Sequence, residues 1–140
     1  MKQIVITGST RGIGLAMAKE FLKAGCRVTL SGRGDTLPQS AQDALAAYVE
    51  YYQYVPCNVR QMAQLQALWD AAVQRFGGVD IWINNAGQNA PHATVADTQE
   101  QYVRGVIETN LLGMIYGSQV AARGMLAQGS GAIYSMEGLG

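Results

Sequence analysis

The sequence opens with MKQIVITGSTRGIG, residues Met1 to Gly14, and this stretch decides the fold. Ile4 to Thr7 are consecutive apolar or β-branched residues, which predicts a short buried strand. The chain then turns at Gly8, and an apolar-periodic helix begins near Gly12. A strand, a glycine turn and a helix N-terminus in this order suit a pyrophosphate, because backbone amides can approach the anion closely.

The glycines Gly8, Gly12 and Gly14 give the spacing T-G-x-x-x-G-x-G. This differs from the tighter G-x-G-x-x-G of the commoner dinucleotide fingerprint. A glycine turn alone is also typical of an ordinary loop between a strand and a helix. The choice between a phosphate site and a plain loop therefore depends on the later segments of the chain.

Composition narrows the class of protein. The 140 residues suffice for one domain with its own core, and ten basic residues balance ten acidic ones. This balance produces no field that would attract nucleic acid or a charged membrane surface. No apolar run approaches the roughly 20 residues that span a bilayer, and the N-terminus does not resemble a signal peptide, so we expect a cytoplasmic protein. Cys26 and Cys57 lack metal-like spacing, so we expect free thiols and no metal site.

Strand and helix patterns alternate along the whole chain. The predicted strands cover 4–7, 27–31, 52–57, 79–83 and 132–136, and the predicted helices cover about 12–24, 41–50, 60–76 and 97–128. Such alternation is typical of an α/β fold with a doubly wound parallel sheet, Rossmann-like, with strand order 3-2-1-4-5. We expect one domain over residues 1–140 that is incomplete after the fifth strand.

The polar motifs of the sequence follow four different predicted strands. The glycine turn follows the first strand, Arg33 the second, Asn58 the third and Asn84 to Gly87 the fourth. Because parallel strands end at one edge of a sheet, we expect these segments to converge there. The last helix carries several glycines, which predicts that another backbone approaches it closely.

These motifs together resemble the short-chain dehydrogenase/reductase family over the whole chain. They are TGSTRGIG at Thr7 to Gly14, CNV at Cys57 to Val59, NNAG at Asn84 to Gly87, and Asn110 within ETNLLG. DIWINNAGQNA and the final IYSMEGLG are most similar to the chlorophyll(ide) b reductase-like branch of plants and cyanobacteria.

The resemblance implies a nicotinamide dinucleotide as cofactor and hydride transfer to or from a carbonyl or alcohol, with a small molecule as substrate. By this resemblance Asn110 holds a water of the proton relay and belongs to the catalytic machinery. The residues that it assigns to cofactor binding are Gly8, Thr10, Arg11, Gly12, Ile13, Gly14, Arg33, Asn58, Val59, Asn85, Ala86 and Gly87.

Charge at the end of the second strand predicts which cofactor is preferred. A carboxylate there would bind the ribose 2′-hydroxyl, whereas an arginine pairs with a 2′-phosphate. Ser31 to Arg33 contain no acid, and Arg11 supplies a second cation, so NADP(H) is favoured over NAD(H). Asp35 argues for the opposite choice, because a small loop movement would bring it to the ribose.

The family's catalytic Tyr-x-x-x-Lys does not occur in this sequence, whose lysines are Lys2, Lys19 and Lys23. The position of the family's catalytic serine aligns with Gly138. The chain therefore resembles the front portion of an NADP(H)-dependent oxidoreductase, with a non-catalytic nucleotide-binding fragment or decayed family member as the alternative. A methyltransferase is disfavoured, since NNAG and Arg33 would have no use in one. We expect self-association, a homo-oligomer formed through the long helix and the open sheet edge.

Overall fold

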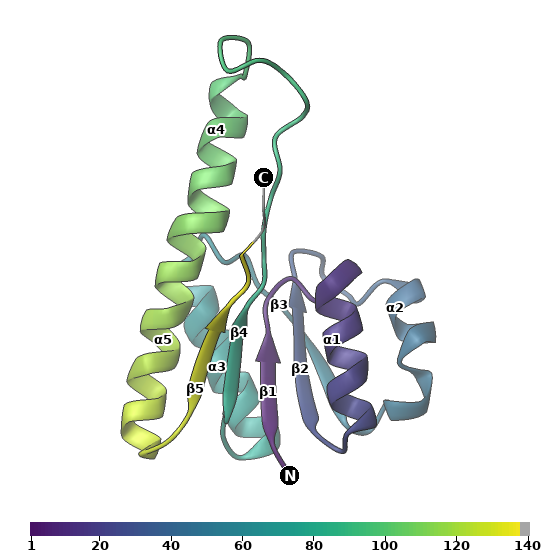
Figure 1. Ribbon diagram of the computed structural model, residues 1–140. Coiled ribbons are helices and arrows are strands. Elements are labelled where there is room, and N and C mark those ends of the chain that lie inside the picture. The colour runs from purple at the N-terminus through teal and green to yellow at the C-terminus, as the bar shows by residue number, and fades with distance from the viewer. Residues whose placement is uncertain (138–140) are drawn as a thin grey trace.

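The computed structural model describes residues 1–137, which form a parallel sheet with helices on both faces (Figure 1). In sheet order the strands are β3 (Tyr52–Pro56), β2 (Arg27–Gly32), β1 (Gln3–Ile6), β4 (Ile81–Asn84) and β5 (Ala132–Ser135). Every neighbouring pair is parallel. The prediction of a doubly wound α/β sheet with order 3-2-1-4-5 is confirmed.

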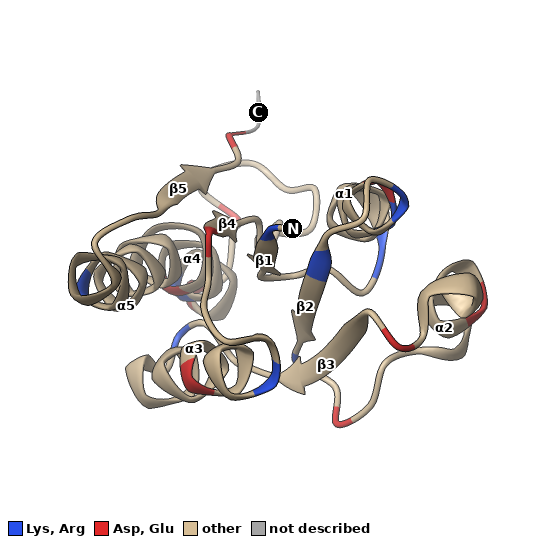
Figure 2. Ribbon diagram, turned by 90° about the horizontal axis from the view of Figure 1, so that it is seen from below, with Lys and Arg blue, Asp and Glu red and all other residues tan. Residues whose placement is uncertain are grey.

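Two helical layers cover the sheet (Figure 2). One layer holds α1 (Gly12–Lys23) and α2 (Gln39–Ala44), followed by the short 3₁₀ turn η1 (Ala46–Tyr48). The other holds α3 (Met62–Phe76) and a long helix made of α4 (Glu100–Val106), η2 (Ile107–Leu112) and α5 (Gly113–Gln128). Successive side chains of β1 point to opposite faces of the sheet. Ile4 and Ile6 belong to the core under α1, and Val5 belongs to the core under α3 and α5.

Most predicted elements differ from the structure by one or two residues at an end, and three of the differences have an identifiable cause or bear on the site. The predicted helix 41–50 is only α2 plus η1, because the fully buried Leu45 leaves helical geometry with φ −107°. The long helix begins at Glu100, since Thr94 accepts the backbone amides of Asp97 and Thr98 in a preceding turn. The fourth strand ends one residue later than predicted and includes Asn84.

The middle of the long helix is a π-helical segment. Residues Ile107–Leu112 have this wider winding, and Val106, Ile107 and Leu112 keep right-handed helical dihedral angles. The helix therefore runs through the segment without a break, and α4 extends past the carboxyl ends of the strands (Figure 1). Single turns of π-helix often occur at functional sites.

The glycines of the long helix meet side chains rather than the backbone of another helix. Built Cβ atoms at Gly113, Gly117 and Gly124 would collide with Val59, Asn84 and Trp69 respectively. The prediction that another backbone approaches the glycines was therefore wrong, because side chains are the nearest groups. The glycines instead leave room for large or polar side chains between the helix and the sheet.

Candidate functional site

The glycine turn lies against the segment that follows β4. Gly8 has φ +62°, and a Cβ built on it would lie 2.6 Å from the Ala86 Cα. A Cβ built on Gly14 would lie 2.6 Å from the Asn85 Nδ2 atom. Asn85 Nδ2 also donates to the Gly8 carbonyl oxygen at 2.9 Å. Two segments far apart in sequence thus form one continuous surface. A side chain larger than that of glycine at position 8 or 14 would prevent their close approach.

Two buried hydroxyl groups hold this turn to both neighbouring strands. Thr7 Oγ1 accepts the backbone amides of Asn85 and Ala86, each at 3.0 Å. Ser9 Oγ accepts the backbone amide of Ser31 at 2.9 Å and donates to the Ile6 carbonyl at 2.7 Å. The ends of β1, β2 and β4 are therefore joined by side-chain hydrogen bonds just beyond the regular sheet.

The N-terminus of α1 presents backbone donors at the same edge. Its N-cap residue Arg11 makes no side-chain capping bond, and the first turn contains no acidic residue. The first amides of a helix have no acceptor within the helix, and the helix dipole adds positive potential there. Ile13 in this turn is 65% exposed, so its backbone is not covered by core packing. This donor set and the glycine surface beside it fit a pyrophosphate.

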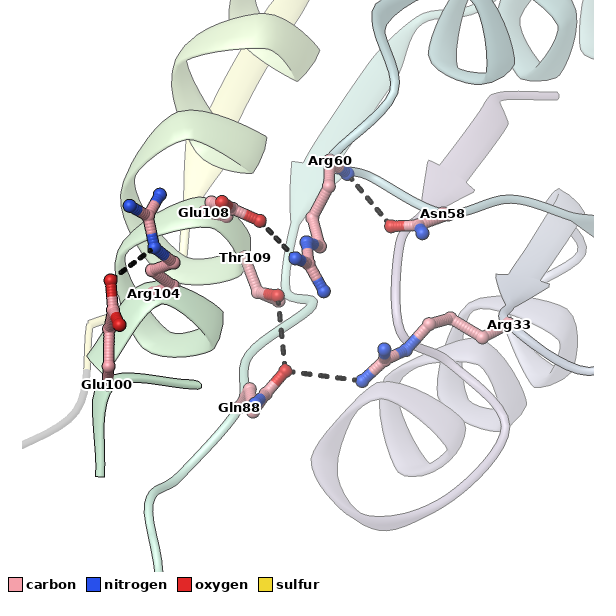
Figure 3. A network of polar contacts seen from close by, with 8 residues as sticks. All are labelled: Arg33, Asn58, Arg60, Gln88, Glu100, Arg104, Glu108 and Thr109. Carbon is pink, nitrogen blue, oxygen red and sulfur yellow. Dashed lines mark hydrogen bonds and ion pairs between the residues drawn. The ribbon is translucent and has the colours of Figure 1, made fainter. Parts of the chain in front are cut away.

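The end of β2 carries the charged groups of the site. Arg33 is exposed, and its Nη2 atom donates to Gln88 Oε1 at 3.3 Å (Figure 3). Tyr54 donates its hydroxyl to the Gly34 carbonyl at 2.5 Å and so fixes the loop after Arg33. Burial, followed by the negative charge of Asp35, raises the pKa of the Tyr54 hydroxyl. The Arg33 guanidinium thus meets Gln88, and Asp35 is exposed two residues further along the same loop.

The turn after β3 is tied to its own backbone and to the long helix. Asn58 Oδ1 accepts the Arg60 amide at 3.1 Å, and Arg60 forms an ion pair with Glu108 of η2 (Figure 3). The Val59 side chain is buried against Gly113 of the long helix. Burial raises the pKa of the neighbouring Cys57 thiol to about 11, which keeps this thiol protonated and unreactive at neutral pH.

Asn110 lies in the π-helical segment and is paired with the backbone of Gln88. Its Oδ1 accepts the Gln88 amide at 2.7 Å, and its Nδ2 donates to the Gln88 carbonyl at 2.9 Å. Gly87 lies beside this pair, because a Cβ built on it would be 3.6 Å from Asn110 Oδ1. The side chain of an otherwise exposed residue therefore fixes the course of the chain after β4.

Comparison with known proteins identifies the family. The model of the short chain dehydrogenase family matches residues 2–138. The chain belongs to this family. The chloroplastic chlorophyll(ide) b reductase NOL of Oryza sativa subsp. japonica is 38% identical over 141 residues, which cover 98% of this chain and 41% of the relative. The predicted resemblance to the family and to its chlorophyll(ide) b reductases is confirmed.

Solved structures of the short-chain dehydrogenase type share the fold. A short-chain type dehydrogenase/reductase from Mycobacterium marinum superimposes with a TM-score of 0.88 at 30% identity, covering 96% of this chain and 54% of that one. ElxO with NADP bound has a TM-score of 0.88 at 28% identity, with the same coverage of 96% and 54%. The chain thus spans about half the length of these relatives or less.

The expectation of a cytoplasmic protein is contradicted by the relatives. The chlorophyll(ide) b reductases NOL of Oryza sativa and Arabidopsis thaliana, 38% and 35% identical to this chain, are both chloroplastic. They point to the chloroplast rather than the cytoplasm. Composition gave the wrong compartment because the interior and surface of a dehydrogenase domain do not depend on the compartment. Targeting to an organelle is determined by leader segments.

Within residues 1–137, none of the helices combines the length and the apolarity needed to cross a bilayer. The same residues contain no group of three or more His, Cys, Asp or Glu side chains that could hold a metal ion.

The structure brings most of the predicted site residues to one edge. The glycine turn, Arg33, Asn58 and the segment Asn85 to Gly87 all lie at the carboxyl ends of their strands, and Asn110 reaches them from the long helix. Thr10 packs there too, since a Cβ on Gly32 would lie 2.6 Å from its Cγ2 atom. The position Gly138 of the family's serine lies outside the described residues.

Sequence reasoning missed Thr7, Ser9 and Gln88 as residues that build the site. Their hydrogen-bond partners are up to 79 positions away along the chain, so no local pattern reveals them. The available signal was a small hydroxyl residue on each side of Gly8, at the end of an otherwise apolar strand.

We expect Thr7→Val to destabilise the protein by about 2–4 kcal/mol, because it leaves two part-buried backbone amides without an acceptor. Unfolding in urea, followed by circular dichroism, measures this change as a lower midpoint. Thr36→Val is the matched control, since Thr36 is exposed in the loop after β2 and should change stability by less than about 0.5 kcal/mol. Equal midpoints for Thr7→Val and the unsubstituted chain would contradict the role of the Thr7 hydroxyl.

Proposed function

We propose that this chain is the cofactor-binding part of an NADP(H)-dependent oxidoreductase that acts on a carbonyl or alcohol. The observation that carries the proposal is the joint surface formed by the Gly8 turn, the uncapped α1 N-terminus and residues 85–87. It lies where the strand order of the sheet reverses, between β1 and β4, and open α/β sheets bind ligands at that point.

The pyrophosphate would lie on the amides of Gly12 to Gly14, with Thr10 and Arg11 on the adenosine side. Asn58 would meet the adenine through its Nδ2 group, since its Oδ1 already accepts the Arg60 amide. The segment Asn85 to Gly87 would flank the ribose on the nicotinamide side. These assignments follow the family resemblance, and the convergence of the segments supports them.

Arg33 supports the choice of NADP(H) over NAD(H). It is exposed at the end of β2, and an arginine can bind a phosphate through two parallel charge-assisted hydrogen bonds. The competing carboxylate of Asp35 lies two residues further along the same exposed loop. The structural neighbour ElxO has NADP bound, which is consistent with this choice.

Catalysis requires more groups than these 140 residues contain. By the family resemblance Asn110 would hold a water of the proton relay, but the family's general acid and the lysine that lowers its pKa are absent from this sequence. We therefore propose that the activity belongs to a longer protein or assembly of which this chain is a part. The alternative is a nucleotide-binding module without catalysis, and the missing Tyr-x-x-x-Lys is the observation that favours it.

Self-association is the second part of the proposal. The long helix exposes an apolar stripe with a residue every fourth position, namely Val103, Ile107, Leu111 and Ile115. At the sheet edge, Tyr134 and Met136 are also exposed, and an apolar groove of about 480 Å³ lies between α5 and β5. Exposed apolar stripes and open strand edges both favour pairing with another chain.

Arg33→Leu is expected to weaken binding of NADPH by about tenfold or more, because a charge-assisted phosphate contact is worth roughly 1.5–3 kcal/mol. Binding of NADH, which has no 2′-phosphate, should not weaken. Titration of the chain into each nucleotide, followed by nicotinamide fluorescence, measures both affinities. Arg75→Leu is the control, because Arg75 lies in the last turn of α3, remote from the glycine turn. Equal losses for NADPH and NADH would refute the assignment of Arg33.

The chain tested alone should bind NADPH without oxidising it. The absorbance of NADPH at the nicotinamide band is expected to stay constant when carbonyl compounds are added, because this chain has no general acid to protonate the product. Oxidation of NADPH by the 140-residue chain would show that it is catalytically complete and would exclude both readings given above.

Introducing charge into the apolar stripe should separate the associated chains. We expect the double substitution Ile107→Lys and Leu111→Lys to lower the mass measured by light scattering, because a buried lysine would be desolvated without a partner. Val49→Lys is the control, since Val49 is 64% exposed and lies outside the stripe. If light scattering shows that the unsubstituted chain is already monomeric, the proposed association is refuted.

A further inference from the structure

We propose that Gln88 determines how the cofactor is admitted. Its side chain holds Arg33 across the proposed cofactor site, so that a nucleotide must displace Arg33, and only a 2′-phosphate gives Arg33 a stronger partner. This inference deepens the proposed function and rests on it. Neither the family motif nor the predicted site residues include Gln88, which follows NNAG directly.

The contact joins two segments that are 55 positions apart. Arg33 Nη2 donates to Gln88 Oε1 at 3.3 Å, and the same oxygen accepts Thr109 Oγ1 at 3.4 Å (Figure 3). The side-chain amide of Gln88 therefore links the loop after β2 to the π-helical segment of the long helix. Its carbonyl oxygen has two donors and is fully engaged.

The strand order shows why this contact crosses the proposed cofactor site. Arg33 follows β2 and Gln88 follows β4, and these strands lie on either side of β1. Two strand spacings amount to about 10 Å, so the two side chains together span the end of β1. A dinucleotide lying from the adenosine side to the nicotinamide side follows the same line. The Arg33–Gln88 hydrogen bond, called the bridge below, and the nucleotide therefore compete for the same space.

Gln88 is the fixed end of the bridge, and Arg33 is the free end. Both backbone groups of Gln88 pair with Asn110, at 2.7 and 2.9 Å. Its side chain lies against Gly105, where any Cβ would collide with the Gln88 amide. Gln88 is half-buried, whereas Arg33 is exposed. Displacement of the bridge thus requires movement of Arg33 alone.

The relative strengths of the two contacts decide the outcome. A phosphate carries full negative charge and can accept two parallel hydrogen bonds from a guanidinium, whereas the Gln88 amide offers Arg33 one neutral oxygen at 3.3 Å. The neutral Gln88 amide therefore loses Arg33 to a 2′-phosphate. A ribose 2′-hydroxyl is itself neutral and offers no such gain, so NADH must break the bridge without a replacement contact of equal strength.

A double-mutant cycle between Arg33 and Gln88 tests this role. Gln88→Leu should tighten NADH binding by about threefold, the size of one exposed hydrogen bond, when Arg33 is present. The same substitution in an Arg33→Leu background should leave NADH affinity unchanged, because no bridge remains to be broken. Gln88→Asn, which keeps the amide but is one methylene shorter, should behave like Gln88→Leu. Gln101→Leu, an exposed residue of α4, is the matched control.

A second measurement needs no nucleotide. The Arg33 guanidinium resonance, assigned by its loss in Arg33→Leu, should shift in Gln88→Leu and not in Gln101→Leu. Equal effects of Gln88→Leu on NADH in both backgrounds, or an unmoved resonance, would overturn the role of Gln88 while leaving NADPH binding intact. If the Arg33 resonance shifts but the chain binds neither nucleotide, the proposed function is refuted instead. The role of Gln88 in cofactor binding would then be refuted with it.

Discussion

The side-chain oxygen of Thr7 is the contact on which the candidate site depends. It accepts two successive amides, from Asn85 and Ala86, and thereby fixes the chain after β4 against the glycine turn after β1. Regular strand pairing ends one residue earlier, at Ile6 and Ile83, and the Thr7 amide adds one backbone hydrogen bond to the Ile83 carbonyl at 3.1 Å. Gly8 and Gly14 then permit the contact distances that a larger side chain would prevent. The hydroxyl group and the missing Cβ atoms act together, and neither would form the surface alone.

The long helix contributes the second fixed point of the site. Its glycines admit Val59, Asn84 and Trp69 between helix and sheet, and this packing sets the position of the π-helical segment relative to the strands. The Arg60–Glu108 ion pair joins the same segment to the turn after β3. Asn110 consequently meets the backbone of Gln88 with both ends of its amide. A poor helix former is retained in mid-helix because its side chain supports the chain after β4 rather than the helix.

The charged groups at this edge have different partners. Arg33 donates to Gln88, and Arg60 pairs with Glu108. The Tyr54 hydroxyl, bonded to the Gly34 carbonyl, fixes the loop that carries Arg33 and Asp35. Membership of the short-chain dehydrogenase family accounts for the fold and the glycine turn. The side chains of Tyr54, Asn58 and Gln88 complete this edge through their hydrogen bonds.

The sequence by itself determined the class of fold, the strand order and the family, because apolar periodicity and glycine spacing are local properties that Ile4 to Gly14 and NNAG display directly. It also indicated that Arg33, Asn58, Asn85 and Asn110 would come to one edge, since parallel strands end together. Only the tertiary structure decided that Arg33 meets Gln88, that Asn110 pairs with Gln88, and that Thr7 and Ser9 hold the turn. Those contacts join residues 20 to 80 positions apart, and a hydroxyl or amide group does not reveal in sequence which distant backbone will meet it.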